Sequence, residues 1–376
     1  MRNIIKFLLL FFSTTCILLG CSQKAENVVI TEKVESEPKI DIIESTLNNM
    51  TITEKVGQMM MIGIYGYDID ENVSWMLHQY HCGGIILYDR NMDTKAQVKQ
   101  LIDNVQNQAE EKVPLFVAID EEGGTVARMK HEIEPAPSQE KIGNSGDTEL
   151  AKMWSINISK ELKLLGINTN FAPVADIGSP DTRSFSNEAE IVTSFVDSAA
   201  RGYEEQNMIY CLKHFPGIGK RITDPHQEIS SINVSRETLE NEDILPFKNI
   251  IKNHANDKFM IMVSHLKYPA IDENNSATLS YEVMTNLLRK DLNYDGIIIT
   301  DDLAMGAISN HNTFKEAAVK AVKAGADIVL VCHDYSHEQE AYLGILEAVQ
   351  NGEMNEERIN ESVRRILKVK LDNLAK

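Results

Sequence analysis

The sequence predicts an α/β fold of the (β/α)8 TIM-barrel type, in which eight parallel strands form a closed ring surrounded by helices. Two observations lead to this fold. Short apolar runs alternate with longer amphipathic segments over roughly 330 residues, which is the order of elements in a parallel α/β protein. Ionisable residues also follow several of the runs directly. A doubly wound open sheet is the alternative that the same alternation allows.

The apolar runs have the composition of strands that are buried on both faces of a parallel sheet. Ile297-Ile298-Ile299 and Phe259-Met260-Ile261-Met262-Val263 are continuously apolar and contain no polar side chain. The predicted strands cover residues 58–64, 84–88, 115–119, 169–172, 208–213, 259–264, 296–300 and 327–332.

The segments between these runs have the periodicity of amphipathic helices. We predict helices over residues 94–110 and 313–324, and Gly325 is suited to end the second of them. Residues 360–374 are predicted to form a last amphipathic helix that closes the chain.

The ionisable residues at the ends of the runs favour the barrel over the open sheet. In a barrel the carboxyl ends of all strands meet on one face, whereas in an open sheet they spread along an edge. One such residue merely marks the end of a strand, but several are better explained as a site. The residues at these ends are Asp120, Lys213, His214, Ser264, His265, Asp301, Asp302 and His333.

The N-terminus has a different composition from the rest of the chain. Arg2 and Lys6 precede an apolar run that begins at Phe7, and this order is typical of a secretory signal over residues 1–20. Leu18-Leu19-Gly20-Cys21 resembles the lipobox of bacterial lipoproteins, in which the cysteine is lipidated; an uncleaved membrane anchor is the alternative. Residues 21–44 are mostly polar and predict a flexible tether. We therefore expect an extracytoplasmic protein, lipid-anchored to the cell membrane, with one domain over residues 45–376.

Composition excludes some classes of partner. The formal net charge of −19 argues against nucleic-acid binding, which requires a basic surface. Cys82, Cys211 and Cys332 lie within or beside apolar runs, so we predict buried thiols rather than a disulfide framework. No histidine or cysteine spacing fits a metal site, and we expect no metal or cofactor.

Three short stretches carry candidate chemistry, each with a simpler structural alternative. Asp301 at a strand end suits a nucleophile of a retaining glycosidase, or a helix N-cap. Asp120, followed by a glycine pair, suits a ligand of two sugar hydroxyls, or a plain acidic turn. Asp224 lies two residues before His226, close enough to fix its tautomer; a structural pair is the alternative.

Together these stretches resemble the glycoside hydrolase family 3 β-N-acetylglucosaminidases of the NagZ type. The family pattern reads D-x-E-G-G-x-x-x-R, N-F-A-P-V-x-D, K-H-F-P-G-x-G with D-x-H beyond it, and [ST]-D-x-L-x-M. These motifs occur here in the same order, from about residue 45 to the end of the chain, at 120–128, 170–176, 213–226 and 300–305.

The resemblance implies a fold, an activity and a set of roles. It implies that residues 45–376 are a single catalytic (β/α)8 domain that removes terminal β-linked N-acetylglucosamine with retention, through a covalent glycosyl-enzyme. It implies Asp301 as the nucleophile, supported by Asp302, and His226 as the general acid/base, paired with Asp224. The implied ligands of the terminal sugar are Asp120, Arg128, Arg183, Lys213 and His214.

The chain departs from the family pattern at two places. Glu121 stands where the family commonly has glutamine, and Ile218, Lys220 and Arg221 stand in a loop that often reads G-H-G-D-T. The open alternatives are a phosphorylase that uses phosphate instead of water, a β-glucosidase, and a lipid-anchored solute-binding protein. The expected partners are a glycan such as a peptidoglycan fragment, a chitin oligosaccharide or a glycoconjugate, and the membrane, with the protein itself a monomer.

Overall fold

A computed structural model describes residues 41–109, 113–179, 181–219 and 230–375, which form one compact unit beginning at Asp41. The predicted signal, the lipidation site Cys21 and most of the predicted tether lie outside the described residues. So do Asp224 and His226, and Lys220 and Arg221, at which the chain departs from the family pattern.

Eight parallel strands form the barrel. Their order is β10-β1-β2-β3-β4-β5-β6-β9, and every neighbouring pair is parallel. The ring is closed between β9 and β10, where Thr300 N donates to Ile328 O (3.1 Å) and Leu303 N donates to Leu330 O (3.0 Å). All eight predicted strands and the barrel are confirmed, and the open sheet is excluded. The strands are β1 Met60–Gly63, β2 Gly84–Leu87, β3 Phe116–Ile119, β4 Thr169–Asn170, β5 Ile209–Phe215, β6 Phe259–Val263, β9 Ile297–Thr300 and β10 Val329–Val331.

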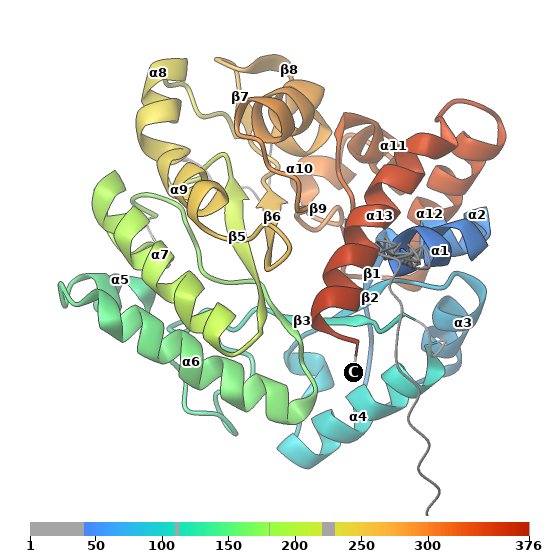
Figure 1. Cartoon of the computed structure of the whole chain (residues 1–376), viewed down its shortest axis with the longest axis horizontal. Helices are drawn as coiled ribbons and strands as arrows, with labels where there is room; N and C mark the ends of the chain where they lie inside the picture. The colour runs from blue at the N-terminus through green and yellow to red at the C-terminus, as the bar shows by residue number, and fades with distance from the viewer. Residues whose placement is uncertain (1–40, 110–112, 180, 220–229, 376) are drawn as a thin grey trace, which may run out of the picture. The chain divides into compact units, whose positions relative to one another are not determined.

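Helices surround the strands and connect each one to the next (Figure 1). The longer helices are α1 Ile42–Asn49, α2 Ile52–Gln58, α3 Glu71–Gln79, α4 Lys95–Gln108, α6 Thr148–Leu165, α7 Ala189–Glu205, α9 Leu245–Asn253, the π-helix η4 Glu282–Asp291, α11 Phe314–Ala324, α12 Tyr335–Gln350 and α13 Glu356–Asn373. The shorter elements are η1 Asp89–Asn91, α5 Gln139–Gly143, α8 Arg236–Thr238, η2 Leu239–Asp243, η3 Ala277–Leu279, α10 Gly306–Ser309 and the antiparallel pair β7 Lys267–Tyr268 and β8 Asp272–Ser276.

Capping residues explain where the helices begin and end. Thr94 caps α4, and Thr313 forms a capping box at the start of α11, which ends at Gly325 with φ of 131°. Both helices confirm the prediction. Helix α13 begins at Glu356, earlier than predicted, because the Asn355 side chain accepts a hydrogen bond from the backbone of its first turn. That turn is polar and so lacks the apolar repeat on which the prediction depended.

Helix α1 corrects the start of the folded domain. Asp41 caps this helix, which begins at Ile42 and thus includes residues that we assigned to the tether. Its Leu47 is buried, and Glu44 forms an ion pair with Arg364 of α13. The apolar residues of this segment therefore belong to the domain rather than to the tether.

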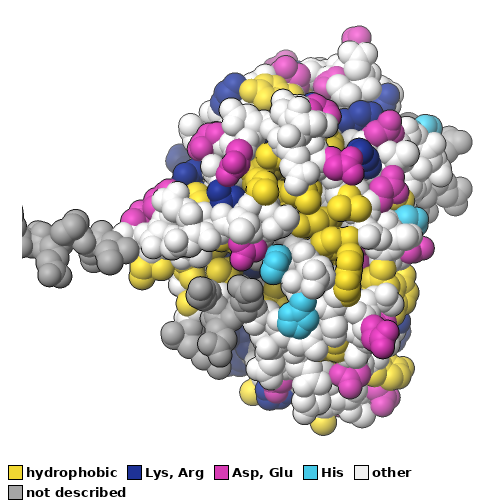
Figure 2. All heavy atoms as spheres, turned by 90° about the vertical axis from the view of Figure 1, so that its right-hand side faces the viewer, with side chains coloured by type: hydrophobic (Ala, Val, Ile, Leu, Met, Phe, Trp, Pro, Cys, Tyr) yellow, Lys and Arg dark blue, Asp and Glu magenta, His cyan; other side chains and the backbone are white. Residues whose placement is uncertain are grey.

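The core lies inside the barrel and between the barrel and its helices. Cys82, Cys211 and Cys332 are free thiols buried in this core, as predicted. The surface is mixed, and the face toward which α2, α3, α11 and α12 turn carries acidic and basic side chains among apolar ones (Figure 2). Within the described ranges, no helix combines the length and the apolar composition needed to cross a membrane.

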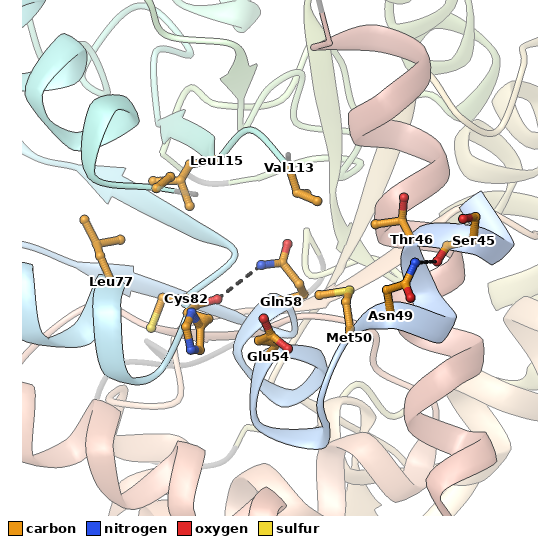
Figure 3. Close-up of a pocket in the computed structure, with 12 residues that line it drawn as sticks. Ser45, Thr46, Asn49, Met50, Glu54, Gln58, Leu77, Cys82, Val113 and Leu115 are labelled. Atoms are coloured by element: carbon orange, nitrogen blue, oxygen red, sulfur yellow. Dashed lines mark hydrogen bonds between the residues drawn. The ribbon is translucent and has the colours of Figure 1, made fainter. Parts of the chain in front are cut away.

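A cavity of about 420 Å³ lies at the amino-terminal end of the barrel. It is lined by residues of α1 and α2 and by residues that precede β2 and β3, among them Met50, Gln58, Cys82 and Leu115 (Figure 3). Gln58 Nε2 donates to His81 O across one wall (3.2 Å). No residue predicted for the active site lines this cavity, and enzymatic sites of barrels lie at the opposite face.

The carboxyl group of Glu338 in α12 makes the stability of the domain depend on pH. This residue is fully buried, and burial raises its pKa to about 9, despite the nearby Arg90 guanidinium and the N–H of Gly63. The native state therefore keeps a proton that the unfolded chain loses above its ordinary pKa of 4.5, so stability falls as pH rises from about 4.5 to about 9.

Replacing Glu338 with glutamine should remove this dependence, because an amide cannot ionise. We expect Glu338→Gln to be more stable than the parent by up to about 3 kcal/mol near pH 7, with almost no difference near pH 4. Thermal unfolding of both proteins across this pH range measures the gap. A gap that is constant with pH would contradict the assignment of Glu338 as a buried, protonated carboxyl.

Candidate active site

The predicted site residues that the structure describes lie together at the carboxyl ends of the strands. Asp120 follows β3, Lys213 and His214 lie in β5, and Asp301 follows β9. Asp120 Oδ1 lies 2.6 Å from Lys213 Nζ, although 93 positions separate the two residues in the sequence. The closed barrel accounts for this meeting, because it turns all of these strand ends toward one face.

A buried network of charges forms the centre of the site. Lys213 Nζ lies 2.6 Å from Asp120 Oδ1 and 2.6 Å from Glu122 Oε1, and its side chain is only 3% exposed. Arg183 holds the same Glu122 with both Nε and Nη2, each at 2.8 Å. The guanidinium and the ammonium thus share one buried carboxylate. This arrangement fixes Lys213 and Arg183 so that their remaining N–H groups can bind hydroxyl oxygens.

The pKa values of this network favour the charged forms. Burial raises the pKa of Asp120 and Glu122, but the Lys213 ammonium, together with Arg128 at Asp120 and Arg183 at Glu122, lowers both below their usual range. Burial likewise lowers the pKa of Lys213, and the two carboxylates more than offset it, so the pKa is raised. The site is therefore built of ionised groups near neutral pH, which suits the binding of polar hydroxyls.

The turn after β3 holds Asp120 and Arg128 in place. Gly123 has φ of 93°, and a Cβ atom there would lie 2.7 Å from Pro137 O, so the turn requires glycine. Arg128 Nη2 lies 3.6 Å from Asp120 Oδ2, and its Nη1 lies 3.6 Å from Asp89 Oδ2. The glycine pair thus lets the chain fold back, so that Arg128 at the end of the turn lies near Asp120 at its beginning.

The side chain of Glu121 stabilises the turn from inside. Its Oε2 accepts hydrogen bonds from the backbone N–H groups of Arg128 (2.8 Å) and Met129 (3.4 Å). Its Oε1 is buried and has no hydrogen-bond partner among the described residues, and burial raises the pKa of Glu121 to about 7. A protonated glutamic acid and a glutamine have nearly the same shape. A protonated Glu121 can therefore fill the same space in this turn as the glutamine that the family commonly has.

An irregularity in β5 lets two successive residues both reach the site. Side chains normally alternate between the two sides of a strand, but the register of β5 against β6 shifts between Leu212 and Phe215. Lys213 can therefore contact Asp120 while His214 Nδ1 lies 2.8 Å from Asp176 Oδ2. Because a carboxylate only accepts, Nδ1 of His214 carries the proton, and Nε2 is left for a ligand.

Asp301 is a partly buried carboxylate kept in its ionised form. Burial raises its pKa, but the imidazoles of His265 and His214 and the N–H of Asp302 lower it below the usual aspartate range. His265 is held on both sides: Nε2 lies 2.8 Å from Asp302 O, and Nδ1 lies 2.8 Å from Thr278 Oγ1. The Asp302 carbonyl can only accept, so Nε2 of His265 carries a proton and donates a hydrogen bond to the backbone of Asp302, the residue after Asp301.

The side chain of Asp302 points away from that of Asp301, because the side chains of successive residues at a strand end point in different directions. Its Oδ1 accepts from the N–H groups of Ala304 (3.0 Å) and Cys332 (3.0 Å), which ties the end of β9 to the end of β10. Its Oδ2 lies 3.9 Å from His333 Nε2. Asp302 thus supports the position of Asp301 through the backbone.

Three residues that position the predicted site residues were not predicted from the sequence. Glu122, Asp176 and His265 are all buried; the first two contact predicted ligands, and His265 lowers the pKa of the predicted nucleophile. Glu122 and Asp176 belong to the motifs that we quoted, and His265 to the set of strand ends. The signal was therefore present, but the sequence alone did not say which acidic residue pairs with which base.

The site, its order along the chain and its barrel match a known family. Residues 51–369 match the model of the glycosyl hydrolase family 3 N-terminal domain. The chain belongs to glycoside hydrolase family 3. The resemblance that we drew from the four motifs is therefore confirmed at the level of the family.

Curated relatives in this family carry related names. Beta-hexosaminidase A of Pseudoalteromonas piscicida is 32% identical over 368 residues, which cover 85% of this chain and 61% of that relative. A beta-hexosaminidase of Glaesserella parasuis serovar 5 (strain SH0165) is 32% identical over 73% of this chain and 81% of its own length. The chain thus spans less than two thirds of the first relative and most of the second.

Solved structures in the family share the barrel. The glycoside hydrolase family 3 β-N-acetylglucosaminidase of Paenibacillus sp. str. FPU-7 superposes with a TM-score of 0.84 at 38% identity, covering 87% of this chain and 63% of that one. The β-N-acetylhexosaminidase of Beutenbergia cavernae DSM 12333 gives a TM-score of 0.76 at 26% identity, covering 86% and 99%.

The arrangement is suited to acid–base and nucleophilic chemistry on a polar substrate. Asp301 is an ionised carboxylate at a strand end, and the ammonium, guanidinium and imidazole groups around it offer hydrogen bonds. Within the part of the chain that the structure describes, no three His, Cys, Asp or Glu side chains group so as to hold a metal ion.

Proposed function

We propose that this protein is a retaining exo-β-N-acetylglucosaminidase that removes terminal β-linked N-acetylglucosamine from peptidoglycan fragments or related glycans. One observation carries the proposal: the ionised Asp301 lies at the end of β9, beside the charged network of Lys213, Asp120, Glu122 and Arg183. The names of the relatives beta-hexosaminidase A and β-N-acetylglucosaminidase support the same class of substrate.

In the first step Asp301 attacks the anomeric carbon. A bond forms between its carboxylate oxygen and C1, and the bond from C1 to the leaving oxygen breaks. The side chains of Lys213, Arg183 and His214 bind the hydroxyl groups of the terminal sugar, and Asp120 accepts from them. This step needs an ionised Asp301, which its lowered pKa provides near neutral pH.

His226 moves the protons. It gives one to the leaving oxygen in the first step, and in the second it takes one from the water that attacks C1 and releases the sugar with retained configuration. Asp224 hydrogen-bonds the ring and sets its tautomer. Both roles rest on the family motif, because these residues lie outside the described part of the chain.

Replacing His226 with alanine should slow hydrolysis according to the leaving group. For methyl β-N-acetylglucosaminide, which needs a proton as it leaves, we expect kcat/KM to fall by about 10² to 10⁴-fold. For a dinitrophenyl glycoside, whose leaving group needs no proton, the first step should be nearly unchanged. Steady-state and burst kinetics with both substrates measure this. Equal losses on both would contradict the role of His226 as the general acid.

Two assays separate the proposal from its rivals. Release from aryl β-N-acetylglucosaminide and from aryl β-glucoside should differ strongly in favour of the acetylated substrate. A preference for the glucoside would indicate a β-glucosidase instead. Lys220 and Arg221 in the loop before His226 are cations that suit an anion, so the same assay is run with and without phosphate. Formation of the sugar 1-phosphate would indicate a phosphorylase.

We also propose that the protein is anchored outside the cytoplasm by a lipid on Cys21. The proposal rests on the signal-like residues 1–20 and the Leu-Leu-Gly-Cys sequence that ends at Cys21. Mass spectrometry of the protein purified from membranes tests it. A lipid-modified N-terminal cysteine is the expected result, and an unmodified cysteine would contradict it.

A further inference from the structure

A cluster of aromatic and cationic side chains lies beside the proposed site, at the ends of three neighbouring strands. It consists of Tyr65 after β1, Tyr88 and Arg90 after β2, and His333 after β10, and we call it the β1–β2–β10 cluster. The mechanism above assigns it no role. Yet Tyr65 is 38% exposed and the His333 side chain 50% exposed, so both present surface at the active face of the barrel.

Arg90 makes the cluster rigid. Its Nε donates to Ile64 O (2.8 Å), its Nη2 donates to Cys332 O (2.7 Å), and its Nη1 lies 3.1 Å from His333 Nδ1. The plane of the guanidinium is thus fixed by three contacts with the segments that follow β1 and β10. Its faces lie against two rings, with its Cζ 4.5 Å from the centroid of Tyr65 and 4.8 Å from that of Tyr88.

Tyr65 is held at both of its ends as well. Its hydroxyl accepts from Asp334 N (2.9 Å), and its backbone N–H donates to the hydroxyl of Tyr335 (3.3 Å). The rings of Tyr65 and Tyr335 meet edge to face at 5.4 Å. An exposed tyrosine that is fixed in this way offers its surface without losing side-chain freedom when a ligand binds.

The hydrogen bonds of His333 decide which of its nitrogens carries the proton. A guanidinium only donates, so His333 Nδ1 must accept from Arg90, and the proton of the neutral ring is on Nε2. Burial and the Arg90 charge lower the pKa of His333, which keeps the ring neutral near pH 7. Its Nε2–H group is therefore a fixed, uncharged donor.

The cluster adjoins the proposed sugar site on two sides. On one side His333 Nε2 lies 3.9 Å from Asp302 Oδ2, too far for a direct hydrogen bond but suited to a hydroxyl that bridges them. On the other side the Cζ of Arg128 lies 5.2 Å from the centroid of Tyr88, while its Nη2 lies 3.6 Å from Asp120. The hydrogen-bonding groups and aromatic rings of the cluster therefore lie directly beside the charged network.

We propose that the β1–β2–β10 cluster is a second saccharide-binding site that receives the sugar on the leaving-group side of the scissile bond. The exposed ring of Tyr65 packs against the C–H groups of that sugar, whose partial positive charge matches the negative face of the ring. His333 Nε2–H and Asp302 Oδ2 bind one of its hydroxyl groups from either side. The inference rests on the proposed function, because it needs a scissile bond at Asp301.

The test compares a leaving group that fills this site with one that is too small to reach it. The substrates are N,N′-diacetylchitobiose, whose leaving group is a sugar, and methyl β-N-acetylglucosaminide, whose leaving group is methanol. We expect Tyr65→Ala and His333→Ala each to lower kcat/KM for the disaccharide by about 10-fold, and for the methyl glycoside by no more than about 2-fold.

Variants and controls separate binding from folding. Tyr65→Phe keeps the ring and should keep most of the disaccharide activity, whereas Tyr65→Ala should not. Tyr281→Ala removes another exposed tyrosine, 49% exposed at the N-cap of η4 and not part of the cluster, and should change the hydrolysis of neither substrate. Thermal unfolding of each variant shows whether the loss of a ring contact with Arg90 has unfolded the rim.

The outcomes distinguish the two proposals. If the parent protein hydrolyses neither substrate, the proposed function fails, and the second site fails with it. If the parent hydrolyses both and Tyr65→Ala and His333→Ala lose the same factor on both, the proposed function stands and the second site is overturned. A selective loss on the disaccharide supports it.

Discussion

Replacing Asp301 with alanine is expected to reduce kcat/KM for an aryl β-N-acetylglucosaminide by at least about 10⁴-fold, the order seen when the nucleophile of a covalent mechanism is removed. The carboxylate supplies the only bond to C1 in the first step, so no other side chain can replace it. The fold should survive, because the Asp301 side chain accepts within the described residues only from the neighbouring N–H of Asp302, at 2.8 Å. Circular dichroism and thermal unfolding check this directly.

Rescue of the Asp301→Ala variant by an added nucleophile is a complementary test. Azide added to the variant can occupy the space that the carboxylate leaves and attack C1 from the same face, which gives the α-glycosyl azide from an activated aryl substrate. Asp291→Ala, which removes a carboxylate that is 58% exposed on the outer surface, serves as the matched control and should keep full activity. Unchanged turnover in Asp301→Ala would mean that another residue is the nucleophile.

Replacing Lys213 with methionine is expected to damage both binding and stability. The ammonium is the shared partner of the buried Glu122 and the partly buried Asp120, at 2.6 Å from each, and methionine leaves both carboxylates without it. Breaking a buried ion pair by removing one partner costs about 3–5 kcal/mol, so we expect the free energy of unfolding to fall by that order. Losing a donor to the sugar hydroxyls should lower kcat/KM by about 10²-fold or more.

A second substitution tests whether the loss of stability comes from the ion pair between Lys213 and Glu122. Glu122→Gln removes one of the carboxylates that Lys213 neutralises, so the double variant should lose less stability than the sum of the single variants. Chemical denaturation of all four proteins gives this coupling. If the two losses simply add, Lys213 and Glu122 do not interact in the way the geometry indicates. Lys213→Arg keeps the charge and is expected to lie between the parent and methionine.

The barrel follows from features that are local in the sequence. Runs such as Ile297-Ile298-Ile299 are apolar without interruption because their strands are covered on both faces, and this composition is visible without a structure. Helix boundaries with clear caps, such as Thr313 and Gly325, were equally readable. The starts of α1 and α13 were not. Ile42 and Ile43 of α1 adjoin a mostly polar segment and were assigned to the tether, and the first turn of α13 is polar, so both starts depend on the caps Asp41 and Asn355.

The site was predictable in part for the same reason. The strand ends that carry Asp120, Lys213 and Asp301 can be read from the sequence, and only a closed barrel brings them together. The pairing of charges cannot be read in this way, because it depends on distances across the barrel. Glu122 bridges Lys213 and Arg183, and Asp176 holds His214, through contacts between residues that lie 38 or more positions apart.

The cluster beside the site shows a similar limit. Tyr65, Arg90 and His333 belong to no motif, and each alone is an ordinary residue of a loop. They acquire the proposed role only because β10, β1 and β2 are neighbours in the ring. The sequence predicts that the ring closes, but it does not show which side chains after these strands then contact one another.

The most direct test of the account is to identify the residue that becomes covalently attached to the sugar. The protein is incubated with a fluorinated N-acetylglucosaminyl fluoride that slows release of the glycosyl-enzyme, then denatured, digested and analysed by mass spectrometry. The account predicts one added sugar residue on the peptide that contains Asp301, and none in the Asp301→Ala variant. A modified peptide elsewhere in the chain, or turnover without any covalent species together with inverted product, would contradict it.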